Sequence, residues 1–508
     1  MTQWKRARLA SSTALVSVLL TGVAIADVTP EEVWQNWQDI STTSGQIITT
    51  TSVARDGDAL VVTDFVSSFE QEDVAVNIAI DEVVFTDNGD GTVTMTMSEE
   101  YPIEMTFPAA AGDDGPTDIT VLVAQPGLEV LAAGDALAAS YEFKAPSLTI
   151  MLNEISGVDA ERLDVEATAI LTDMAGSYLV SGEVGAKSIE SAFSAANMTL
   201  AMSGADAETA SSFVLAASIA DLAGASKSLL KGVELIENLA AALKAGFATD
   251  STFSYGAVNL DLDTTENSAP TRIVTNGKGG GFNVKLDATG MTYGANGNGA
   301  EITITSPAIP FSEVKLSYAE GAFNLMMPML KSEAPEDFTF VTRIVDLAVS
   351  DEIWGMIDPG GAIPHDPATV ILDTKGKVKL TSDLADPAQM EALGENAPGE
   401  IHALDLTELK VTAAGADLTG IGSLTFDNSD MVTFAGSPLP TGKIDLKLVG
   451  GNALIDKLVT MGILTSDDAN GARMMMSMFA NPGAGADELT STLEFKDKGF
   501  FANGQQLQ

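Results

Sequence analysis

Residues with strong chemical reactivity are scarce in this 508-residue chain: His365 and His402 are its two histidines, and it has no cysteine. A zinc site built on three histidines is therefore excluded, and a serine–histidine–acid triad would have to use one of these two residues. Neither lies near a nucleophile elbow, and the serine context closest to that motif, residues 224–228, lacks its closing glycine. The prolines around His365 indicate a loop histidine with ordinary partners. The sequence assigns no catalytic residue, no metal ligand and no cofactor-binding residue.

Two glycine-containing segments have the composition of ligand loops but the wrong surroundings. Residues 87–91 are rich in Asp and Gly, as in a calcium-binding EF-hand loop, but that pattern would require acids where Thr86 and Met97 stand. Strand-like runs on both sides favour a hairpin turn there. Residues 276–281 form a glycine cluster that leads into a strand-like run, whereas a phosphate loop leads into a helix. Neither segment predicts a cofactor.

Neighbouring carboxylates, such as Glu99 with Glu100 and Asp467 with Asp468, are the other groups that could do chemistry. Two close carboxylates can serve as general acid and general base in hydrolysis. Because the chain has 71 acidic residues, a chance pair carries little information. The second pair also fits the first turn of a helix, where acids favour the helix dipole. An envelope hydrolase that uses acidic residues stays an alternative function.

Methionines gather in two places. They are Met474, Met475, Met476 and Met478 in a helical segment, and Met326, Met327 and Met329 in a strand-like run. Flexible thioether side chains suit apolar surfaces that accept varied partners. Met474 and Met478 have the spacing of an ordinary core helix, which favours burial instead.

The elements that would position these residues are a few helices among many strands. Helices are expected near residues 29–40, 233–247, 351–357, 452–461 and 466–479. The first begins with Thr29 as N-cap, Pro30 at the first helical position and Glu32 completing a capping box. Runs with period two fill most of the rest and turn at Gly and Asp, as at residues 55–58. The expected fold class is α+β and β-rich, with long curved antiparallel sheets in a meander, packed by a few amphipathic helices.

A change of composition near Lys331 and Pro335 divides the chain into β-rich regions at residues 27–330 and 331–508. In the first region Tyr255, Tyr293 and Tyr318 stand in similar local contexts, which predicts tyrosines on a common side of one sheet; coincidence is the alternative. In the second, residues 375–376 are predicted to turn a hairpin between strands at 369–373 and 378–380.

The first 26 residues have the pattern of a secretory signal peptide. Lys5, Arg6 and Arg8 precede an apolar run at residues 14–23, and residues 24–26 match the rule for cleavage after Ala26. That run is too short to span a bilayer, and no later segment has the roughly 18 apolar residues of a transmembrane helix. We expect a periplasmic protein that is not an integral membrane protein, with an uncleaved anchor as the alternative.

The formal net charge of −45 limits the partners. Nucleic acid is excluded because phosphate binding needs a clustered basic surface, and an anionic membrane would repel the chain. The acids are dispersed, which favours a role in solubility in a salty exterior; capture of cations or of a basic partner is the alternative.

Three stretches carry a family resemblance: EVWQNW at residues 32–37, IWGMIDPG at 353–360 with IPHDPAT at 363–369, and residues 454–504. They resemble the alphaproteobacterial exported proteins classed as domain of unknown function 2125, over most of the mature chain. That family has no assigned activity, so the resemblance implies a bacterial envelope protein and no site residues. At the level of fold the sequence is also similar to AsmA-like envelope proteins, which implies long curved sheets with a lipid-accommodating groove.

The leading hypothesis is a non-enzymatic periplasmic binding or envelope-maintenance protein. It would accommodate an apolar ligand such as a lipid, or contact another envelope protein. An envelope hydrolase and a structural scaffold of the cell envelope are the alternatives.

Overall fold

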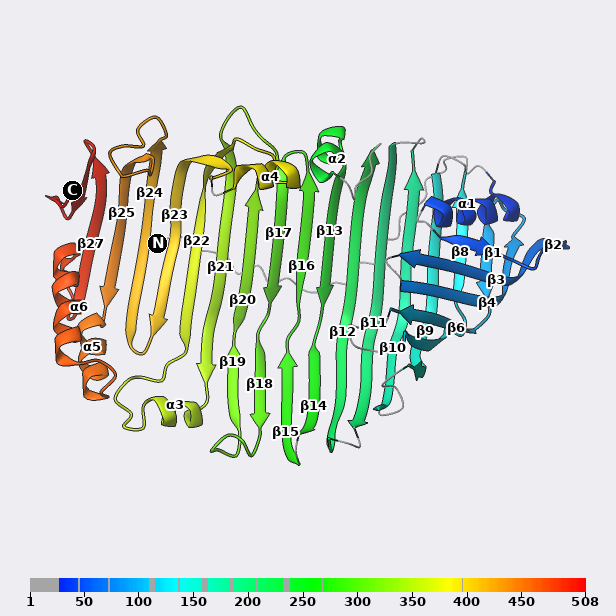
Figure 1. Ribbon diagram of the computed structural model, residues 1–508, viewed down its shortest axis with the longest axis horizontal. Helices are drawn as coiled ribbons and strands as arrows, with labels where there is room; N and C mark the ends of the chain where they lie inside the picture. The colour runs from blue at the N-terminus through cyan, green and yellow to red at the C-terminus, as the bar shows by residue number, and fades with distance from the viewer. Residues whose placement is uncertain are drawn as a thin grey trace.

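The computed structural model describes residues 27–43, 46–71, 74–108, 115–135, 138–157, 163–182, 186–206, 209–231, 238–266, 268–394 and 396–508. The predicted signal peptide at residues 1–26 lies outside these residues. In the described part of the chain, 29 strands form one antiparallel sheet, and helices lie at its ends and edges (Figure 1). Strand accounts for 64% and helix for 13%, which confirms the β-rich fold class.

The N-terminal strands fold around α1 (Pro30–Thr43). They are β1 (Ile47–Thr49), β2 (Ser52–Asp56), β3 (Ala59–Gln71), β4 (Val74–Asp87), β5 (Val93–Met97), β6 (Glu100–Phe107), β7 (Thr117–Ala124), β8 (Glu129–Gly134) and β9 (Ala138–Ser156). Trp34 and Trp37 of α1 pack against Phe65 and Phe85, with ring centroids 5.8 to 6.4 Å apart. Apart from Trp37, these rings are buried in one hydrophobic core with side chains of β3, β4, β5, β8 and β9.

Beyond β9 the strands run across the direction of β3 and β4, and the first three of them are longer than those two (Figure 1). First come β10 (Leu163–Ser181), β11 (Ala186–Asp206) and β12 (Ser211–Lys231). Each of the next four positions in the sheet holds two shorter strands: β13 (Ala248–Tyr255) with β14 (Val258–Glu266), β16 (Gly280–Asp287) with β15 (Ala269–Gly277), β17 (Gly290–Gly297) with β18 (Ala300–Thr305), and β20 (Glu320–Met327) with β19 (Val314–Tyr318).

The sheet ends with single strands again. They are β21 (Glu336–Val349), β22 (Ala368–Leu380), β23 (Gly399–Ala413), β24 (Ala416–Asp427), β25 (Leu439–Val449), β26 (Asn481–Pro482), β27 (Glu488–Lys496), β28 (Gly499–Ala502) and β29 (Gln505–Gln506). Pairing of β20 with β21 carries the sheet across residue 330, where the sequence suggests a division. That division stays a prediction.

Five short helices border this sheet (Figure 1). They are α2 (Leu239–Ala245) and α4 (Pro387–Leu393) at one edge, α3 (Asp351–Ile357) at the other, and α5 (Gly451–Thr460) and α6 (Ser466–Phe479) at the C-terminal end. Every expected helix is present, although residues 233–237 of the second lie outside the described residues. The sequence reading missed α4. None of the described helices combines the length and the apolar run needed to cross a membrane.

An aspartate with a left-handed backbone interrupts four strands. The residues are Asp64, Asp173, Asp221 and Asp346, with φ of 50° to 54°. In β3, both Val62 before Asp64 and Phe65 after it are buried in the same core. Strict alternation would point Phe65 to the opposite face. The aspartate therefore acts as a bulge that keeps apolar side chains on one side, and its short polar side chain tolerates the positive φ.

In the long sheet, similar interruptions of neighbouring strands lie side by side and form a line from β10 to β21. In β12 the less exposed positions include Ile219 before Asp221 and Leu222 after it, so the alternation shifts by one residue there. The backbone N–H of Gly256 donates to the Ala220 carbonyl next to that bulge. The line continues between β16 and β15, between β17 and β18, and between β20 and β19. We call it the break line.

The long sheet is a single layer. In the described part of the chain, no second sheet or long helix packs on the strands from β10 to β23.

The hairpin predicted at residues 375–376 is wrong, because β22 runs unbroken from Ala368 to Leu380. Gly376 lies in mid-strand, where a Cβ would stand 2.1 Å from the backbone oxygen of Ala403 in β23 and 2.6 Å from a ring carbon of Phe338. The glycine makes room for the neighbouring backbone and for an aromatic ring, and it does not turn the chain.

Candidate functional site

Large apolar side chains of neighbouring strands lie side by side on one face of the long sheet. Phe253 of β13 is opposite Phe282 of β16, which is opposite Ala295 of β17. We call this surface the apolar face, and its larger members are Phe143, Phe193, Phe253, Phe282, Tyr293, Phe323, Phe340, Leu372, Leu409 and Leu446. Residues of the other parity, such as Asn283 and Glu408, belong to the opposite face.

Aromatic rings form a row across the middle of the apolar face. Phe253 and Phe282 stack with centroids 5.2 Å apart. Tyr293 and Phe323 are 6.0 Å apart, and Phe340 follows at 5.7 Å. The row crosses five neighbouring strands, about 20 Å at the usual strand spacing. Phe282 is 45% exposed and Tyr293 is 40% exposed, so the row is open to a ligand.

Glycines lie beneath several rings. The pairs are Phe143 with Gly176, Phe213 with Gly204, Tyr255 with Gly280, Tyr318 with Gly297, and Phe338 with Gly376. Since Gly280 and Gly297 are opposite each other and Tyr293 has the parity of Gly297, the three tyrosines share one face, as the sequence predicts. Without side chains below them, the rings lie close to the backbone and leave a broad surface above.

The C-terminal end of the apolar face is enclosed by α6. A cavity of about 500 Å³ lies there, within the ~300–1,000 Å³ usual for small-molecule pockets. Its lining is Leu418, Leu446, Leu448, Ala472, Met475, Met476, Phe479, Ala480, Leu489, Ser491 and Leu493. We call it the α6 pocket. Ser491 supplies its one side-chain hydroxyl, which already donates to the Phe479 carbonyl at 2.5 Å.

Hydrogen bonds and an ion pair fasten α6 over this pocket. Thr465 and Asp468 form a capping box at its beginning. Arg473 is paired with Asp456 of α5 at 2.6 Å. At the other end, Asn503 Nδ2 donates to the Phe479 carbonyl at 2.9 Å. The helix is therefore held at both ends, and its methionines lie in its C-terminal half.

The methionines of α6 do not form the core predicted from their spacing. Met474 is 68% exposed and Met478 is 55% exposed. The inward side of the helix is taken instead by Ala472, Met476 and Phe479. Helical spacing identifies residues on one side, but it does not say which side meets the sheet.

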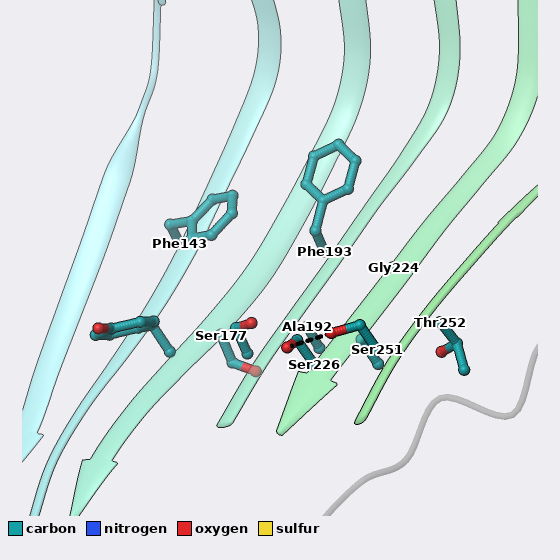
Figure 2. Close-up of a pocket in the computed structure, with 11 residues that line it drawn as sticks. Phe143, Ser177, Ala192, Phe193, Gly224, Ser226, Ser251 and Thr252 are labelled. Atoms are coloured by element: carbon teal, nitrogen blue, oxygen red, sulfur yellow. Dashed lines mark hydrogen bonds between the residues drawn. The ribbon is translucent and has the colours of Figure 1, made fainter. Parts of the chain in front are cut away.

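A second cavity of about 340 Å³ lies between β9 and β13, near the N-terminal end of the apolar face. Figure 2 shows Phe143 and Phe193 on one side of it and serines on the other. Ser226 and Ser251 share a hydrogen bond of 2.8 Å between their hydroxyl oxygens. We call it the serine pocket. Its polar groups are partly satisfied by one another and carry no charge.

Comparison with known proteins places the C-terminal half in a family. Residues 241–502 match the model of a family described as an uncharacterized protein conserved in bacteria, domain of unknown function 2125. The chain belongs to this family. No curated protein and no solved structure matches it. The similarity to AsmA-like proteins stays an expectation.

In this family member, the matched segment contains the α6 pocket and a corner built around Asp358. The buried Asp358 carboxylate accepts the N–H groups of Ile363 at 2.8 Å and Ala362 at 2.9 Å. These two hydrogen bonds, aided by His365, outweigh burial and hold the pKa of Asp358 below its usual value. Trp354 stacks on His365 with centroids 4.4 Å apart. His365 is thus a loop residue with structural partners, as expected.

A second buried carboxylate, Asp383, ties the edge helices of this domain of unknown function 2125 protein to the sheet. It accepts hydrogen bonds from Lys244 of α2 at 2.5 Å, from the Lys331 N–H at 2.8 Å and from Gln389 of α4 at 3.0 Å. Burial would raise the pKa of Asp383, but these three donors, Lys244 foremost, outweigh it and lower the pKa. Its side chain is 3% exposed, so it is a structural anchor.

Ser226, in the serine context closest to a nucleophile elbow, is far from His402 in this family member. Ser226 lies on β12, and six strands separate it from His402 on β23, about 34 Å at the usual strand spacing. Within the described residues, no group of three or more His, Cys, Asp or Glu side chains could hold a metal ion. The apolar face and the α6 pocket instead provide apolar side chains that a ligand can contact.

Proposed function

We propose that this protein is a non-enzymatic, lipid-accommodating protein of the bacterial cell envelope, and that its apolar face binds acyl chains. The observation that carries the proposal is the open row of aromatic rings that leads, across β22 to β25, to the α6 pocket. The envelope location is supported by the signal-peptide pattern at residues 1–26.

The linings of the cavities favour binding over reaction. The α6 pocket and the serine pocket are lined by apolar side chains, glycine, serine and threonine. A third cavity, between α1 and β8 to β10, is lined by Trp37, Ser41, Val130, Tyr141 and Tyr178. Among the described residues, no carboxylate, imidazole or amine belongs to these linings. General acid–base catalysis needs such groups within hydrogen-bond reach of the substrate.

The shape of the surface favours a long flexible ligand. Cross-strand register continues the apolar face from Phe323 through Thr342 to Leu372, then through Leu409 and Gly420 to Leu446. A Cβ on Gly420 would stand 2.6 Å from Leu446, so the glycine leaves room for the Leu446 side chain to lie close to the sheet. An acyl chain can lie across successive strands and gain burial along its whole length.

Displaceable binding of a fluorescent fatty acid tests the proposal. Phe282→Glu places a charge in the aromatic row and should weaken binding about tenfold or more, because it removes a large apolar contact. Ile421→Glu is the matched control, since Ile421 is 60% exposed and lies opposite Asp445, on the other face. For the α6 pocket, Ala472→Leu fills the cavity and should also weaken fatty-acid binding. Asn470→Leu is its control, because it makes a comparable change at an exposed position of α6 and should leave binding unchanged.

Native mass spectrometry of protein purified from its own periplasm checks the same idea without a probe. The expected result is a co-purifying lipid that Phe282→Glu reduces and Ile421→Glu leaves in place. Absence of any such lipid, together with no displaceable fatty-acid binding, would overturn the proposal.

A further inference from the structure

The outer side of α6 carries apolar side chains that no described element covers. Met474, Met475 and Met478 are 68%, 63% and 55% exposed. Met474 and Met478 are four residues apart, so they lie on the same side of the helix. Ile463, in the turn between α5 and α6, is 56% exposed. We call these four residues the methionine patch.

The patch lies in a part of the chain that is much less acidic than the chain as a whole. Residues 441–508 carry six basic and eight acidic side chains, whereas the 440 residues before them carry 20 basic and 63 acidic ones. A surface that approaches a bilayer must avoid strong negative charge, because anionic headgroups repel it. The C-terminal end meets that condition, whereas the chain taken as a whole does not.

We infer that the methionine patch docks on a zwitterionic phospholipid bilayer. An amphipathic helix lies in the interface with its apolar side between the headgroups, and its unbranched thioether side chains adapt to that environment. The six basic residues are too few, and too often paired with acids, to recruit an anionic surface. Arg473, for example, is engaged by Asp456.

A second copy of this chain is the less fitting occupant. A stable dimer buries about 800 Å² on each partner, and four partly exposed side chains supply much less. A bilayer needs no complementary shape, so a small patch suffices for weak, reversible docking.

The position of the patch connects it to the proposed function, on which this part of the inference rests. The helix that carries the patch also encloses the α6 pocket, and Met475 belongs to both. Figure 1 shows α5 and α6 at the C-terminal end of the sheet, where the apolar face ends. Docking there would bring the α6 pocket to the source of acyl chains.

Flotation with phosphatidylcholine vesicles tests the docking, using the full mature chain. The wild-type protein should float with the vesicles, and adding phosphatidylglycerol to them should reduce flotation at low salt. Met474→Glu combined with Met478→Glu should reduce vesicle binding about tenfold. Met356→Glu is the matched control, because Met356 of α3 is 61% exposed at another edge of the sheet. Equal binding by the double variant and the wild type would overturn the inference.

A second readout does not depend on loss of binding. Because the chain has no cysteine, Met474→Cys and Met356→Cys each allow one environment-sensitive label to be attached. The label at position 474 should shift to the blue when vesicles are added, and the label at 356 should not. Identical responses, or light scattering that shows a dimer abolished by the double variant, would contradict bilayer docking.

The two proposals fail separately. The double variant changes side chains outside the lining of the α6 pocket, so it should keep fatty-acid binding while losing vesicles. Loss of fatty-acid binding in Phe282→Glu with normal flotation is the converse result.

Discussion

The N-terminal strands and the long sheet are built alike but covered differently. In β3 the bulge at Asp64 keeps Val62 and Phe65 on one side, and α1 covers that side with two tryptophans. In β12 the bulge at Asp221 aligns apolar residues in the same way, yet no described helix of comparable length lies over them.

The difference shows that the strand sequence sets which side chains share a face, whereas the elements beside the sheet decide whether that face is buried. At the N-terminal end, the apolar side chains are buried in a core. The long sheet keeps them accessible, as a binding surface requires.

The largest contrast is expected between ring deletions in the two regions. Trp34→Ala should lower the free energy of unfolding by about 3–5 kcal/mol, because it empties a closed core. Phe282→Ala should cost about 1–2 kcal/mol or less, because its ring is still partly solvated in the folded state. Urea unfolding followed by circular dichroism measures both. Equal losses would mean that the apolar face is covered in solution.

A smaller loss of stability is expected when Asp383 is changed. This buried carboxylate, and not a hydrophobic core, holds α2 and α4 to the edge of the long sheet. Asp383→Ala should cost about 2–3 kcal/mol, since three donors lose a buried charged acceptor. The exposed ion pair of Asp337 with Lys377 provides the control, and Asp337→Ala should cost about 1 kcal/mol at most.

The contribution of Asp383 should also appear in the dependence of folding stability on pH. Because the pKa of Asp383 is lowered on folding, its contribution to stability is complete above the unfolded pKa of about 4 and is lost as pH falls through the lower folded pKa. Asp383→Asn should flatten the decline in stability below about pH 4. A variant that declines as steeply as the wild type would show that other carboxylates dominate.

The smallest effect concerns the bulges, where both regions should respond alike. Asp64→Val and Asp221→Val each force a β-branched residue to a positive φ, at a cost of about 1–2 kcal/mol. Glycine at either position should restore most of the stability. Asp250→Val, at an exposed position of β13 with ordinary backbone, is the control. Thermal unfolding distinguishes these outcomes, and a cost confined to one region would mean that the bulge depends on what covers it.

Local signals in the sequence predict the helices well. The capping box predicted from Thr29 and Glu32 is present at the beginning of α1, and α3 and α6 have the predicted bounds. The helix α4 was missed, although Asp386 followed by proline is the same kind of start signal. Its seven residues are too few to show a clear helical period.

Other features needed information that periodicity does not contain. Gly376 looks like a turn residue because the sequence does not show the ring of Phe338 above it. Met474 and Met478 look like core residues because their spacing is the same on either side of the helix. Nothing in a strand pattern says that a second layer is missing.

The bulges, by contrast, could have been found from the sequence. Leu171, Ile219 and Ile344 each stand two residues before the aspartate of a bulge, and an apolar residue follows that aspartate directly. At each of these sites the alternation of apolar positions shifts by one. Such a shift within a long strand-like run predicts a bulge when a residue that tolerates positive φ stands there.

The pairing pattern of the sheet has a consequence for how the chain folds. Every strand pairs with a strand no more than three places away along the sequence, as β13 does with β16. Loop closure therefore costs little at each step, and assembly can proceed by adding neighbours in order, as in a repeat protein. A chain shortened from its C-terminus would then keep a folded remnant whose melting behaviour changes gradually with length.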